Sequence, residues 1–147
     1  MGKHITLTSE DGFELAAYTA DPEGPARGGI VVIQEIFGVN IHVREMVDRY
    51  AASGYLAIAP AVFDRVERNV ELGYTPDDMQ AGIAIVAGGQ LDFTKVLADT
   101  RAAGRFAWSY LGRTVSNPSN GCSASSSPTT TRQTTPTRSE TTTPSRT

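Results

Sequence analysis

The sequence predicts an α/β protein with a parallel sheet that the chain enters through an antiparallel hairpin. Two apolar runs carry this prediction, Ile30–Ile33 and Tyr55–Pro60, because unbroken runs of this kind suit strands covered on both faces. The segment between them has helical periodicity. A strand, a helix and a second strand within about 30 residues form a right-handed βαβ unit.

The hairpin is predicted from alternating polar and apolar residues on both sides of Asp11-Gly12. An Asp-Gly pair supplies the backbone conformation of a tight turn, so the flanking segments should pair as antiparallel strands. Residues 21–29 contain two prolines and three glycines and are expected to form a loop.

The helix of the βαβ unit is predicted from apolar residues three and four positions apart, namely Val43, Met46, Val47, Tyr50 and Ala51. Asn40 is placed to cap its start and Gly54 to end it. Pro60 closes the strand that follows.

Beyond this unit the sequence predicts a long loop over residues 61–75 and two further helices. Pro76-Asp77-Asp78 should open a helix that runs to about Ala87, where Gly88-Gly89 breaks it. An amphipathic helix should follow Asp92 and reach Leu111, covering one face of the sheet. A third parallel strand is expected next, and the sequence does not provide one.

Residues 112–147 have the composition of a disordered, low-complexity tail. More than half of the residues after Arg113 are Ser or Thr, and apolar residues are almost absent. Such a segment cannot bury enough apolar surface to offset the entropy lost on ordering. The predicted folded part is therefore residues 1–111.

Composition excludes several classes of function. The net charge of −3 gives no basic stripe for nucleic acid, and no run approaches the about 20 apolar residues that span a bilayer. The amino terminus does not resemble a secretory signal, so a cytoplasmic protein is expected. The single cysteine, Cys122, excludes an intrachain disulfide and a multi-cysteine zinc site.

The turn after the first parallel strand is the best candidate for chemistry. Ligand sites in open α/β sheets form beyond the carboxyl ends of the strands, and here Gln34 and Glu35 end an apolar strand. Burial would raise the pKa of such a carboxyl group unless a partner stabilises the charge. A purely structural interpretation is that Glu35 pairs with an arginine such as Arg44 or caps a backbone turn.

The run Gln34-Glu35-Ile36-Phe37-Gly38-Val39-Asn40 resembles the dienelactone hydrolases (carboxymethylenebutenolidases), and the likeness continues through residues 53–65 and weakly to Leu111. The resemblance implies an α/β hydrolase fold in which a cysteine attacks a small lactone or ester and no cofactor is needed. By this resemblance Glu35 helps to form the cysteine thiolate, and the Ile36 N–H supplies half of the oxyanion hole.

The remaining catalytic groups of that family have no clear counterparts. Cys122 lies in Asn120–Ser125, which no predicted strand precedes and in which no glycine follows the cysteine, so a nucleophile elbow is not expected. No Asp or His follows Cys122, although the family's triad order requires both. His4 and His42 are expected to be surface residues. Arg65 could meet a substrate carboxylate, but a surface position is favoured and no role is assigned to it.

Residues 1–111 are therefore interpreted as a partial hydrolase domain, truncated before the nucleophile elbow and inactive alone. A shifted reading frame or a wrongly joined gene model would explain the abrupt Ser/Thr-rich tail, and the nucleotide sequence after the codon for Leu111 would test this hypothesis. One alternative is a noncatalytic βαβ binding module with a flexible tail. A nucleotide-binding module is the other, although Gly28-Gly29 precedes the strand and no Gly-x-Gly-x-x-Gly is present.

Overall fold

The structure is a computed structural model and describes residues 1–115. Its strands are β1 (Lys3–Thr8), β2 (Glu14–Ala20), β3 (Gly29–Val31) and β4 (Leu56–Pro60). Its helices are α1 (Ile41–Ala52), the 3-10 helix η1 (Val62–Arg65), α2 (Pro76–Ala87) and α3 (Phe93–Val115). The first four residues of the predicted tail, 112–115, belong to α3. The rest of the predicted tail, with Cys122, lies outside the described residues. Within residues 1–115 no helix is both long and apolar enough to cross a membrane.

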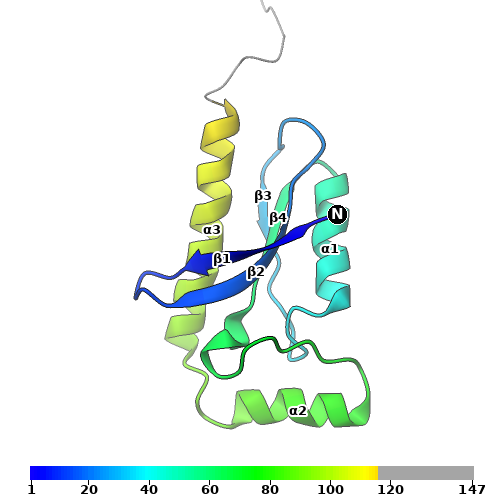
Figure 1. The fold of residues 1–147 in the computed structure, drawn as a ribbon, viewed down its shortest axis with the longest axis vertical. Helices are drawn as coiled ribbons and strands as arrows, with labels where there is room; N and C mark the ends of the chain where they lie inside the picture. Colours follow the sequence, from blue (N-terminus) through cyan, green and yellow to red (C-terminus); the bar gives the residue numbers. More distant parts are fainter. Residues whose placement is uncertain (116–147) are drawn as a thin grey trace, which may run out of the picture.

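The four described strands form one mixed sheet in the order β1-β2-β4-β3 (Figure 1). The hairpin pairs β1 with β2 in antiparallel register, with Leu7 opposite Leu15, and β2 pairs antiparallel with β4. β3 and β4 are parallel, with Ile30 opposite Ala57. These pairings confirm the predicted hairpin and the parallel βαβ unit.

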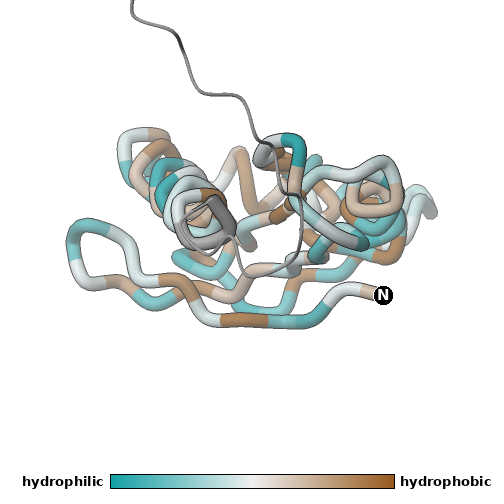
Figure 2. Tube along the Cα trace, turned by 90° about the horizontal axis from the view of Figure 1, so that it is seen from above, coloured by the Kyte–Doolittle hydropathy of each residue, from teal (hydrophilic) through white to brown (hydrophobic). Residues whose placement is uncertain are grey.

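Helices cover the two faces of the sheet from opposite sides, α1 on one and α3 on the other (Figures 1 and 2). β4 shows this division residue by residue. Ala57 and Ala59 pack with α1, whereas Leu56 and Ile58 pack with α3, and all four side chains are fully buried. The alternation explains why β4 is apolar along its whole length.

Helix ends agree with the predicted signals. The Asn40 side chain accepts a hydrogen bond from the Val43 N–H at 3.2 Å and caps α1. Thr75 and Asp78 form a capping box at the start of α2. Because α1 begins directly after the turn that follows β3, the Asn40 cap also fixes where that turn ends.

β3 lies at the edge of the described sheet, with β4 as its only strand neighbour there. It was predicted as a strand covered on both faces, yet Ile30 and Val31 are only partly buried and Ile33, just beyond it, is 52% exposed. The outer edge of β3 therefore leaves backbone groups without strand partners within residues 1–115.

Candidate active site

The carboxyl ends of β3 and β4 lie together and carry the predicted site. The chain leaves β3 through Gln34 and Glu35, and it leaves β4 through η1. The side-chain carbonyl of Gln34 links these two exits, because it accepts a hydrogen bond from the Val62 N–H at 3.0 Å. Gln34 is buried, so this bond is shielded from water and holds the two segments in register.

A mostly apolar hollow of about 300 Å³ opens at this point, between the ends of the strands and parts of α2 and α3. Glu35 and Ile36 both line it. The other lining residues are Ile33, Gln34, Val62, Phe63, Val86, Leu91, Phe93 and Val96. The structure therefore brings both predicted site residues to one concave surface of the size that binds small molecules.

Glu35 has neither of the structural partners that the sequence allowed for it. Arg44 pairs with Glu71 at 2.6 Å and donates to the Val39 carbonyl, so it is not available to Glu35. The Glu35 side chain is exposed, and within residues 1–115 it has no ion pair and caps no turn. The expected burial of this carboxylate was wrong for the described part of the chain.

The Ile36 N–H is a free donor in this part of the chain, because no described group accepts a hydrogen bond from it. Its surroundings are otherwise well ordered by hydrogen bonds. The Gly38 N–H donates to the Glu35 carbonyl at 3.3 Å, and the Leu72 N–H donates to the Phe37 carbonyl at 2.9 Å. Gly38 has a φ of +76°, which favours glycine at this position.

Neither histidine contributes to the hollow. His4 lies on β1 and His42 in the first turn of α1, and both are exposed, as predicted. His4 contacts the Tyr18 ring and His42 contacts the Tyr74 ring. Among residues 1–115 there is also no group of three or more His, Cys, Asp or Glu residues that could hold a metal ion.

Arg65 was predicted to be a surface residue, and that prediction was wrong. Its side chain is only 9% exposed and forms two-pronged hydrogen bonds with both Asp99 and Asp11. It also lies over the Phe13 ring, with 4.3 Å to the ring centre. Arg65 thus joins the hairpin turn, η1 and α3, and its bonds lower the pKa of Asp11 to about 2.

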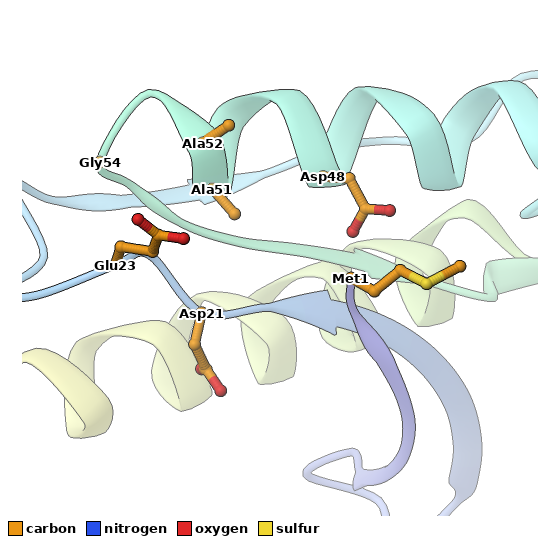
Figure 3. A pocket seen from close by; sticks show the side chains of 7 residues that line it. All are labelled: Met1, Asp21, Glu23, Asp48, Ala51, Ala52 and Gly54. Atoms are coloured by element: carbon orange, nitrogen blue, oxygen red, sulfur yellow. The ribbon is translucent and has the colours of Figure 1, made fainter.

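A second hollow, of about 260 Å³, lies at the opposite end of β4, beside Gly54 (Figure 3). Three carboxylates line it, and two of them already have structural partners. Asp48 accepts hydrogen bonds from the Gly2 N–H and the Tyr18 hydroxyl, and Asp21 pairs with Lys3. We therefore place no chemistry at this end of the molecule.

The mixed sheet, with helices on both faces, is an α/β fold, and the hollow at the carboxyl ends of its parallel strands lies where such folds bind ligands. The family model described as the dienelactone hydrolase family matches residues 15–112. The chain belongs to the dienelactone hydrolase family.

Individual relatives agree with this assignment. A Synechocystis protein is 38% identical over 99 residues, covering 67% of this chain and 39% of the relative. An Azospirillum brasilense protein is 40% identical over 91 residues, covering 60% and 39%. Both are provisionally named carboxymethylenebutenolidases. The chain thus spans about 39% of the length of these two relatives.

Solved structures show the same partial coverage. A crystal structure from Klebsiella pneumoniae, provisionally described as a dienelactone hydrolase, superposes with a TM-score of 0.59 at 30% identity. The superposition covers 75% of this chain and 44% of that one. A structure described as m3DLH superposes with a TM-score of 0.52 at 28% identity.

Proposed function

We propose that residues 1–111 form the first part of a domain that hydrolyses a small lactone or ester through a cysteine nucleophile. Glu35 and the Ile36 N–H are this chain's contribution to the reaction. The nucleophile and its histidine and aspartate partners come from polypeptide outside residues 1–111. The observation that carries the proposal is the pairing of a carboxylate and a backbone donor on one apolar hollow, both without partners among residues 1–115.

The Ile36 N–H has the chemistry of an oxyanion donor. When a thiolate attacks the carbonyl carbon of a lactone or ester, the carbonyl oxygen becomes negatively charged and needs donors that are already in place. A backbone N–H that none of the described groups uses can meet that charge without first breaking a bond. Its position after β3 is where α/β hydrolases place one of their two donors.

Glu35 has the chemistry of a thiol activator. A thiol reacts as its thiolate, so a nearby carboxylate that accepts the thiol proton raises the reactive fraction. Collapse of the tetrahedral intermediate then expels the alcohol or enol group and leaves a thioester. Water releases the acid from that thioester and regenerates the thiol. No cofactor is required for any of these steps.

The edge of β3, which no strand of residues 1–115 pairs, supports the view that more polypeptide completes the site. Apolar side chains beside the hollow are strongly exposed, with Phe93 at 69% and Ile33 at 52%. An open parallel edge next to exposed apolar residues is unfavourable in water unless another segment covers it. The Glu35 carboxylate would be shielded from solvent by the same segment.

The test compares the 147-residue chain with a chimera. The chimera joins residues 1–111 to the part of the Synechocystis relative that follows its matched segment, and circular dichroism checks that it is folded. Both proteins are assayed with a dienelactone and with an aryl acetate. We expect thiol-dependent turnover by the chimera and none by the 147-residue chain.

Two results would contradict the proposal. Activity in the 147-residue chain that disappears in the Cys122→Ala variant would show that the chain supplies its own nucleophile. A folded chimera with no activity on either substrate would argue against the hydrolase function, and the noncatalytic binding module would then gain support.

A further inference from the structure

Helix α2 meets the rest of the described molecule in an unusual way. Gly82 is its only buried residue, whereas Met79 and Ile83 on the same helix are about half exposed. Apolar burial along α2 is therefore limited, with Ile85 and Val86 only partly buried. In Figure 1 the helix runs crosswise beneath the sheet, and its residue Val86 lines the candidate hollow.

Gly82 lies directly against Ile36. A Cβ atom at position 82 would overlap the Ile36 carbonyl oxygen and would lie 3.1 Å from its carbonyl carbon. Apart from proline, glycine is the least favourable residue for a helix interior, so a glycine here needs a reason. The reason in this structure is close approach, because only glycine lets the α2 backbone reach the site turn.

Gln34 restrains the same turn from its other side. Its amide nitrogen reaches the Glu35 carbonyl oxygen at 3.5 Å, and the Gly38 N–H reaches that oxygen at 3.3 Å. The Glu35 carbonyl and the Ile36 N–H belong to one planar peptide group and point in opposite directions. Fixing the oxygen therefore fixes the direction of the N–H.

We propose that Gly82 and Gln34 are positioning residues that hold the Ile36 N–H in a fixed direction before substrate binds. Gly82 lets α2 pack directly against the Ile36 carbonyl group. Gln34 fixes the orientation of the peptide group that precedes Ile36. The inference rests on the proposed function, in which this N–H stabilises an oxyanion. A donor fixed in advance needs no reorganisation when charge develops, which is the property that makes oxyanion holes effective.

The test is nuclear magnetic resonance of the ¹⁵N-labelled 147-residue chain without any substrate. In the wild type we expect the Ile36 amide to be rigid, with an order parameter of about 0.85, and yet to exchange with solvent as an unbonded amide does. In Gly82→Ala we expect its chemical shift to move and its order parameter to fall below about 0.6.

Gly104→Ala is the matched control. Gly104 is also inside a helix, α3, but a Cβ atom there would meet nothing within 4 Å. This variant should raise the unfolding temperature and leave the Ile36 amide unchanged. If Gly82→Ala behaves in the same way as Gly104→Ala, Gly82 does not position Ile36 and the proposal is wrong.

Variants at Gln34 distinguish its contact with the Val62 N–H from its contact with the Glu35 carbonyl. They also test the proposal if Gly82→Ala does not fold. Gln34→Glu keeps an acceptor for the Val62 N–H but removes the donor to the Glu35 carbonyl, whereas Gln34→Met removes both. We expect the Ile36 amide to move in both variants and the Val62 amide to move only in Gln34→Met. An Ile36 amide that is strongly protected in the wild type, or unmoved in both variants, would overturn the proposal.

These measurements do not depend on turnover. If the chimera proves inactive while the Ile36 amide responds as expected, the proposed function fails and the positioning of this amide stands.

Discussion

Removal of the Asp99 carboxylate should destabilise the chain more than any other single ion-pair change in the described part. Asp99 is fully buried and accepts two hydrogen bonds of 2.7 Å from Arg65. Hydrogen bonds to charged groups contribute about 1.5 to 3 kcal/mol each. The Asp99→Ala variant keeps the Asp11 contact of Arg65 but leaves the guanidinium short of a partner, so we expect a loss of about 3 kcal/mol.

The assay is urea unfolding followed by circular dichroism, with Asp21→Ala as the matched control. Asp21 pairs with Lys3 at 2.9 Å, but the two side chains are 37% and 62% exposed. Exposed pairs of this kind contribute at most about 1 kcal/mol. If Asp99→Ala costs no more than Asp21→Ala, the buried network is not a principal support of the fold. The double change Arg65→Met with Asp99→Leu should recover much of the loss, because neither charge then remains buried alone.

Three further outcomes follow from individual contacts. Asn40→Ala removes both the α1 cap and a 2.9 Å hydrogen bond to the Leu72 carbonyl, and urea unfolding should show a loss of about 2 kcal/mol. Ser9→Ala removes a buried hydroxyl without a partner among the described residues, and should raise the unfolding free energy by about 1 kcal/mol. The folded-state pKa of Asp11 is about 2, below its unfolded value, so its stabilising effect is complete above about pH 4 and is lost as the pH falls toward 2. Unfolding midpoints of Asp11→Asn should therefore depend less on pH in that window.

The elements of the fold could be predicted because each has a local cause. Residue alternation around Asp11-Gly12 gives the hairpin, and the Asn40 side chain starts α1 within three residues of its own position. Pro76 opens α2 where the sequence indicated. Such signals come from neighbouring residues in the chain, so they can be recognised without knowledge of the tertiary structure.

The contacts that shape the site could not be predicted in this way. Arg65 meets Asp11 and Asp99 across 54 and 34 residues, so its burial follows from the packing of η1 against α3 and has no local signal. Glycine inside a short helix is intrinsically unfavourable, and the sequence gives no sign of what Gly82 contacts. Its contact with Ile36 depends on how α2 crosses the sheet end, which periodicity does not determine.

The turn from Gln34 to Ile36 was predictable in part, because its position has a local cause and its surroundings do not. Its place after the first parallel strand and its likeness to the dienelactone hydrolases were visible in the sequence, and the structure brings Glu35 and Ile36 to one hollow. The exposure of Glu35 was not foreseen. A carboxylate at the end of an apolar strand normally needs a partner, and here the described residues leave it exposed on the hollow.

The most direct test of this account is the turnover of a dienelactone by the chimera with and without the Glu35 carboxylate. Glu35→Gln preserves the size of the side chain but cannot accept the thiol proton. Groups that act as general bases contribute about 10²- to 10⁴-fold to rate, so we predict that kcat/KM falls at least about 100-fold at neutral pH. An unchanged kcat/KM in a folded variant would contradict the assignment of Glu35 to the reaction.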